Sequence, residues 1–206
     1  MKYSVLLLLI LSLFFQFSCK EKNVEKPDTQ MIIGDSETNV TITTHDTIIF
    51  PLSRCDPYYY NIDLDGDSID DFSFYSYYCY GMCIWYSEMR IDCLSDSSYL
   101  VRNDTIPTVQ ILYAGDTLSQ TLHWESDNFV MLTTEQFGDG DCGGDGIFYV
   151  NGIWRNIDKK YIGCMIKKED HVIYGWLEVN IKQSGRVFTL ELSRTAYKMA
   201  AYDKLK

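Results

Sequence analysis

Residues 172–181 read Val-Ile-Tyr-Gly-Trp-Leu-Glu-Val-Asn-Ile, and residues 186–192 read Arg-Val-Phe-Thr-Leu-Glu-Leu. Apolar and polar side chains alternate along much of both stretches, and valine, isoleucine, threonine and aromatic residues are frequent in them. A period of two residues with this composition is typical of a strand that buries one face and exposes the other. Both stretches are therefore predicted to be β-strands.

Similar short stretches recur along the rest of the chain, and none of any length shows the 3.6-residue period of a helix. We therefore expect residues 32–206 to form one all-β domain, an antiparallel β-sandwich or jelly roll. The only helical candidate is the end, from about Thr195 to Lys204. The other predicted strands are Val40–Thr43, Thr47–Phe50, Tyr58–Ile62, Phe72–Tyr77, Ile84–Tyr86, Met89–Cys93, Thr108–Tyr113, Phe129–Leu132, Ile147–Val150 and Tyr161–Ile166.

The composition is globular and acidic. Hydrophobic residues make up 46% of the chain and charged residues 23%, which is unlike an intrinsically disordered protein. Lysine and arginine total 18 against 29 acidic residues, for a net charge of −11. Phosphate backbones bind basic surfaces, so the charge argues against a nucleic-acid partner. An acidic surface fits solubility or cation binding.

Residues 1–18 have the pattern of a signal peptide: a basic start and an apolar run from Val5 to Phe17 that is too short to span a bilayer comfortably. Cys19 follows a small residue at the end of this run, and the chain then turns polar. This junction resembles a lipobox, in which the cysteine is acylated and becomes the first residue of the mature chain. Gln16 and Phe17 depart from the usual lipobox, so an ordinary secretory signal with an incidental cysteine remains the alternative.

A lipid on Cys19 would anchor the protein to a membrane, and residues 20–31 are polar and aperiodic, as expected of a tether. We therefore expect an outer-membrane lipoprotein whose domain faces either the periplasm or the cell surface. Six further cysteines in an exported protein are candidates for up to three disulfides, and zinc binding is the weaker alternative. These cysteines are Cys55, Cys79, Cys83, Cys93, Cys142 and Cys164.

One motif carries chemistry: an acidic loop between two aromatic strands, Asp-Leu-Asp-Gly-Asp-Ser-Ile-Asp-Asp at residues 63–71. Calcium takes six to eight oxygen ligands, and carboxylates at alternating loop positions can surround one ion. Without a cation, these carboxylates would repel one another. The expected ligands are the side chains of Asp63, Asp65, Asp67 and Asp71 and the backbone carbonyl of Ile69.

The acidic loop resembles the calcium loops of integrin-like propeller repeats and other extracellular calcium modules. It is not an EF-hand, because the twelfth position is Phe74 and strands flank the loop. Ser68 stands where such loops usually place glycine at a sharp turn, so some backbone strain is expected there. The resemblance implies a structural calcium ion rather than a catalytic one; a merely acidic turn is the alternative.

A second resemblance covers about a fifth of the chain. Tyr161-Ile-Gly163, Tyr174-Gly-Trp176-Leu-Glu-Val and Ala196-Tyr197 are similar to a C-terminal pattern of secreted β-proteins common among Bacteroidetes lipoproteins of uncharacterised function. Ordinary pairing of aromatic strands explains the same residues equally well. The resemblance implies no activity.

Catalytic signatures such as Gly-x-Ser-x-Gly, His-Glu-x-x-His or a phosphate loop are absent, so the sequence identifies no catalytic residue. We expect a surface or periplasmic binding module for a glycan or protein ligand, in which tyrosines at 58–60 or 75–80 stack against sugar rings. The alternative is a glycoside hydrolase-like or other hydrolase accessory domain, because two catalytic carboxylates need no fixed spacing.

Overall fold

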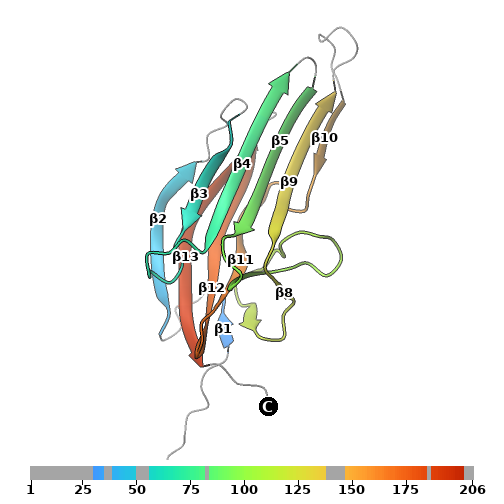
Figure 1. Cartoon of the computed structure of the whole chain (residues 1–206). Coiled ribbons are helices and arrows are strands. Elements are labelled where there is room, and N and C mark those ends of the chain that lie inside the picture. Colours follow the sequence, from blue (N-terminus) through green and yellow to red (C-terminus); the bar gives the residue numbers. More distant parts are fainter. Residues whose placement is uncertain are drawn as a thin grey trace, which may run out of the picture.

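The computed structural model describes residues 30–34, 39–49, 56–81, 84–137, 147–184 and 187–201. Within these residues the protein is all-β, and every pairing between its strands is antiparallel. Two large sheets lie in separate layers (Figure 1). The predicted antiparallel β-sandwich is therefore confirmed.

The first layer is a six-stranded sheet in the order β2-β13-β12-β11-β6-β8. Its long central strands β12 and β13 contain the two stretches that most clearly predicted strands. The full set is β2 (Thr41–Ile49), β6 (Ser98–Val101), β8 (Trp124–Glu125), β11 (Ile157–Lys167), β12 (His171–Ser184) and β13 (Val187–Ala201).

The second layer is a five-stranded sheet in the order β10-β9-β5-β4-β3. Short connections join β3 to β4 and β4 to β5, as expected for neighbouring antiparallel strands. Its strands are β3 (Tyr58–Ile62), β4 (Phe72–Gly81), β5 (Ile84–Cys93), β9 (Asn128–Phe137) and β10 (Ile147–Asn151).

The main core lies between the two sheets. Phe72 and Phe74 of β4 belong to the same buried cluster as Ile162 of β11 and Ile173 of β12. Alternate residues of each strand point into this cluster, which is the arrangement that the two-residue period predicts.

A smaller core covers the opposite, outer face of the six-stranded sheet. Strands β1 (Gln30–Ile32) and β7 (Thr117–Ser119) pair with each other and supply Met31 and Leu118 to it. Tyr174 and Trp176 of β12 belong to this second cluster, so β12 is buried on both faces.

Three expectations about strands differ from the structure. Thr195–Ala201, part of the helical candidate, continues β13, because the segment pairs with β12 as far as His171. The predicted strand Thr108–Tyr113 forms only two isolated bridges, through Val109 and Leu112. The two strands predicted within residues 40–50 are one strand, β2. In each case pairing with distant residues, which local composition does not encode, decides the outcome.

Two of the six cysteines that were candidates for up to three disulfides are not disulfide-bonded. Cys93 and Cys164 are free thiols that face the main core from opposite sheets. Burial raises the pKa of both, that of Cys93 to about 12, so neither is a reactive thiolate. Cys79 is disulfide-bonded. The other candidates, Cys55, Cys83 and Cys142, lie outside the described residues.

The predicted signal peptide at residues 1–18, Cys19 and most of the predicted tether also lie outside the described residues. Gln30 and Met31, which the sequence places at the end of the tether, lie in β1, and the Met31 side chain is fully buried. In the part of the chain that is described, no helix is long and apolar enough to cross a membrane.

Candidate functional sites

The acidic loop connects β3 to β4 and is ordered by its own carboxylates. The Asp63 carboxylate accepts hydrogen bonds from the amides of Gly66 (2.7 Å) and Ser68 (2.8 Å). Asp67 Oδ1 accepts one from the Ile69 amide (2.9 Å). Gly66 and Ser68 have φ angles of 79° and 71°, so the strain expected at Ser68 is present.

Leu64 and Asp71 anchor this loop in the core. The Leu64 side chain is buried against Gly175 of β12, where an added Cβ would lie 2.7 Å from Leu64 Cδ2. The Leu64 amide donates to Asp71 Oδ2 at 2.8 Å. Asp71 is 4% exposed, and burial raises its pKa to about 6, with the nearby charges of Asp65 and Asp67 adding to the rise.

A lysine from the other sheet already neutralises part of the loop. Lys168 follows β11 at its turn toward β12, and its Nζ lies 2.9 Å from Asp65 Oδ2 and 2.8 Å from Asp67 Oδ2. The hydrogen bond from Lys168 is the main reason that the pKa of Asp67 is lowered, and the two carboxylates raise the pKa of Lys168. The ammonium group therefore pairs with two of the carboxylates that were expected to bind calcium.

The structure brings together three of the predicted ligands: carboxylate oxygens of Asp63, Asp65 and Asp71 lie within 4.8 Å of one another. Asp67 is outside this group and turns toward Lys168. Carboxylates converging on a partly buried point form the hard, oxygen-rich donor set that calcium prefers, so these residues fit the ion.

A second feature is a row of tyrosines on the outer face of the five-stranded sheet. Tyr59 of β3 contacts Tyr75 of β4, with ring centroids 5.2 Å apart. Tyr75 stacks on Tyr77 at 6.4 Å with an interplanar angle of 14°, and Tyr77 lies 6.2 Å from Tyr86 of β5. Tyr59 is 54% exposed. We call these four residues the tyrosine row.

Charged groups hold the tyrosine row in place. The Arg90 guanidinium lies 3.8 Å from the centroid of the Tyr75 ring and pairs with Asp92 (2.9 Å) and Glu88 (3.3 Å). Glu88 also accepts a hydrogen bond from the Tyr86 hydroxyl. Rigid aromatic rings beside charged hydrogen-bonding groups form a surface suited to an amphipathic ligand such as a sugar.

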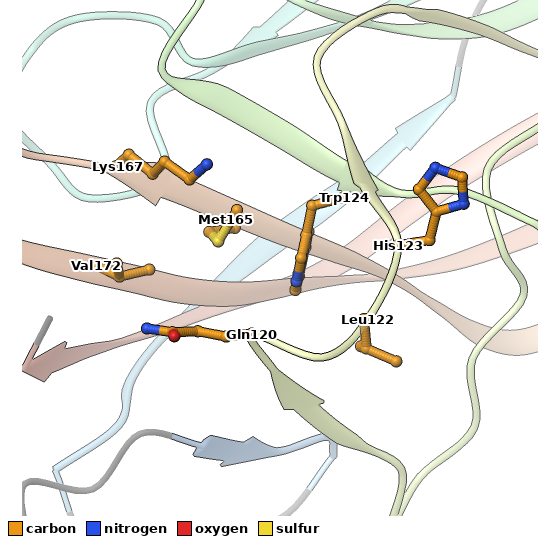
Figure 2. Close-up of a pocket in the computed structure, with 7 residues that line it drawn as sticks. All are labelled: Gln120, Leu122, His123, Trp124, Met165, Lys167 and Val172. Carbon is orange, nitrogen blue, oxygen red and sulfur yellow. The ribbon is translucent and has the colours of Figure 1, made fainter. Parts of the chain in front are cut away.

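A third feature is a pocket of about 400 Å³ on the outer face of the six-stranded sheet (Figure 2). Met165 of β11 and Val172 of β12 line it from the sheet, and Trp124 of β8 stands beside them. The Trp124 indole is fixed by its Nε1 hydrogen bond to the Ser119 carbonyl (2.9 Å). The remaining described lining residues are Gln120, Leu122, His123 and Lys167.

Sequence reasoning anticipated the acidic loop and the tyrosines at 58–60 and 75–80, but it missed Tyr86, Lys168 and the pocket. Lys168 is 101 residues from Asp67, and no local pattern connects them. No sequence motif indicates the pocket, because its described lining residues come from two distant segments, 120–124 and 165–172.

No protein-family model matches the chain, and comparisons with curated proteins and with solved structures likewise find no match. What the protein does is therefore inferred from its own residues.

Proposed function

We propose that this protein is a membrane-anchored extracytoplasmic lipoprotein that binds a glycan on the tyrosine row. Lipid on Cys19 would hold it at the outer membrane, with the domain facing the periplasm or the cell surface. The observation that carries the proposal is the row itself, since Tyr59, Tyr75, Tyr77 and Tyr86 form a continuous series of ring contacts across β3, β4 and β5. Aromatic rings pack against the apolar faces of sugars, and Arg90 and Glu88 can bond sugar hydroxyls.

The same proposal includes a structural calcium ion in the acidic loop. Asp63, Asp65 and Asp71 would supply carboxylate ligands, while Asp67 and the Ile69 carbonyl would join them once Lys168 is displaced. Calcium would remove the repulsion among these carboxylates and fix Leu64 in the core. Extracellular calcium modules bind with dissociation constants of about 0.1–1 mM, which is the affinity expected here.

The hydrolase alternative gains less support from the described residues. Glycoside hydrolysis needs two carboxylates facing each other across the scissile bond. Glu88 and Asp92 instead share Arg90 on one strand, and none of the described residues lining the pocket of Figure 2 is acidic.

A glycan array probed with the full chain tests the glycan proposal. Replacing Tyr59 or Tyr77 by alanine should weaken binding to a positive glycan about 2- to 10-fold for each ring lost. Tyr113→Ala is the matched control, because Tyr113 is 55% exposed, like Tyr59, and lies outside the tyrosine row. An array without any bound glycan, or equal losses in the control variant, would refute the proposal.

A further inference from the structure

The pocket beside Trp124 lies far in sequence from both the tyrosine row and the acidic loop, on a different face of the sandwich. Residues 120–124 form one side of it, and the ends of β11 and β12 form the other (Figure 2). Its apolar wall consists of the Trp124 ring with Met165 and Val172. A volume of about 400 Å³ is in the range of pockets that hold small molecules.

Each polar side chain of the pocket can donate a hydrogen bond. Lys167 contributes an ammonium group, and Gln120 and His123 add an amide and an imidazole. No acidic side chain is found among the described lining residues, although the chain carries 29 acids and a net charge of −11. His123 is paired with Asp104 at 3.0 Å, which leaves Lys167 as the uncompensated cation of the lining.

Lys167 contacts an aromatic ring at the pocket and forms no salt bridge with a described carboxylate. Its Nζ lies 4.1 Å from the centroid of the Tyr99 ring, and no described acidic group forms a salt bridge with it. Tyr99 pairs directly with Met165 across β6 and β11, so the ring and the pocket floor belong to one row of the sheet. The ammonium is therefore positioned for an external anion.

A buried donor without a hydrogen-bond partner packs against the Trp124 ring, although Tyr174, which carries it, is not itself among the described residues that line the pocket. Tyr174 is 1% exposed, and its hydroxyl has no hydrogen-bond partner. Its ring lies 5.8 Å from the Trp124 ring, and Tyr174 is opposite Met165 in the pairing of β11 with β12. Leaving a buried hydroxyl unpaired costs about 1–3 kcal/mol in general, so an acceptor that reached it would be favoured.

We propose that this pocket binds a small apolar carboxylate. Its carboxylate would accept hydrogen bonds from the Lys167 ammonium and the Tyr174 hydroxyl, and its apolar body would pack against Trp124, Met165 and Val172. The two oxygens of a carboxylate can accept hydrogen bonds from both donors. The apolar chain or ring of the ligand would cover the apolar wall of the pocket and exclude water from it.

Isothermal titration of the full chain in phospholipid nanodiscs, with empty nanodiscs as the blank, tests the proposal. The probes are 3-phenylpropionate and its neutral amide, which share an apolar body and differ in charge. The acid should bind about 10-fold or more tightly than the amide, because it makes a charge-assisted bond. No binding of the acid at millimolar concentration, or equal binding of both probes, would overturn the proposal.

Variants assign the effect to named groups. Lys167→Gln should weaken acid binding about 10-fold and abolish the preference for the acid over the amide. Lys160→Gln is the matched control, because Lys160 lies on the same strand and over a tyrosine ring, that of Tyr113 at 4.6 Å, but outside the pocket lining. A preference retained in Lys167→Gln, or lost equally in Lys160→Gln, would contradict the assignment of Lys167.

Tyr174→Phe gives a second and independent signature. Removing an unpaired buried hydroxyl should raise the melting temperature of the free protein, and the same change should weaken binding of 3-phenylpropionate. A purely structural tyrosine would not change the affinity, so unaltered binding in Tyr174→Phe would exclude the hydroxyl as a donor to the ligand.

Discussion

Replacing Lys168 by methionine should make the acidic loop bind calcium more tightly. The Lys168 ammonium lies 2.9 Å from Asp65 Oδ2 and 2.8 Å from Asp67 Oδ2. If the ammonium stayed in place while calcium bound one of the same oxygens at 2.3–2.6 Å, the two cations would be no more than about 5.5 Å apart. Repulsion between them at that distance is about 1.5 kcal/mol even with the dielectric constant of water. Removing the ammonium should therefore raise the calcium affinity about 10-fold.

The same change should destabilise the calcium-free protein. Lys168 makes two partly exposed ion pairs, and such pairs contribute about 0.2–1 kcal/mol each. Without the ammonium, the loop carboxylates repel one another unscreened. Melting curves in a calcium chelator should thus show a lower melting temperature for Lys168→Met, and added calcium should raise it more than in the wild-type protein.

Calorimetric calcium titration of the chelator-treated protein measures the affinity. Lys182→Met is the matched control, because Lys182 is an exposed lysine that pairs with Glu191 at 2.7 Å. Calcium affinity should be unchanged in the control. If Lys168→Met binds calcium no more tightly than the wild-type protein, Lys168 does not compete for the site and the reasoning fails.

Three further predictions concern the loop and the sheet beneath it. Asp71→Asn should abolish the calcium-dependent rise in melting temperature. It should also raise the melting temperature of the calcium-free protein, because a buried carboxyl whose pKa is raised to about 6 destabilises the fold when it is ionised at neutral pH. An undiminished calcium response would contradict the first expectation. Gly175→Ala should cost about 1–3 kcal/mol in urea unfolding, because its Cβ would lie 2.7 Å from the Ala196 carbonyl oxygen; wild-type stability would show that the strand can move. Burial raises the pKa of Glu178, but hydrogen bonds, the largest from Arg194, outweigh burial and lower the pKa below its ordinary value of 4.5. The ionised Glu178 therefore contributes its full stabilisation above pH 4.5, and this contribution is lost as the pH falls through the lower pKa of the folded state. Glu178→Gln should make the free energy of unfolding fall less steeply as the pH is lowered, and an unchanged pH dependence would contradict this prediction.

Local patterns in the sequence were enough to predict the fold class and to locate the acidic loop. Alternation over residues 172–181 predicts a strand because successive side chains point to opposite faces, whatever the strand pairs with. The spacing of Asp63, Asp65 and Asp67 likewise lies within one short loop, where neighbouring residues fix one another's geometry. The strained φ at Ser68 was anticipated for the same reason.

Local patterns could not decide which strands pair or where a side chain is buried. The segment Thr195–Ala201 has no strong preference of its own, and its place between β12 and β2 makes it a strand. The even count of six cysteines made Cys93 and Cys164 disulfide candidates, yet each faces the core as a free thiol.

The sequence by itself therefore determined an acidic all-β chain with a loop of closely spaced aspartates, because strand period and loop spacing are properties of neighbouring residues. Only the tertiary structure decided that Lys168 reaches this loop across the sandwich, that Trp124 and Lys167 line one pocket, and that Tyr174 packs against Trp124. Contacts of this kind join residues far apart in the chain, and they depend on the pairing and twist of whole sheets.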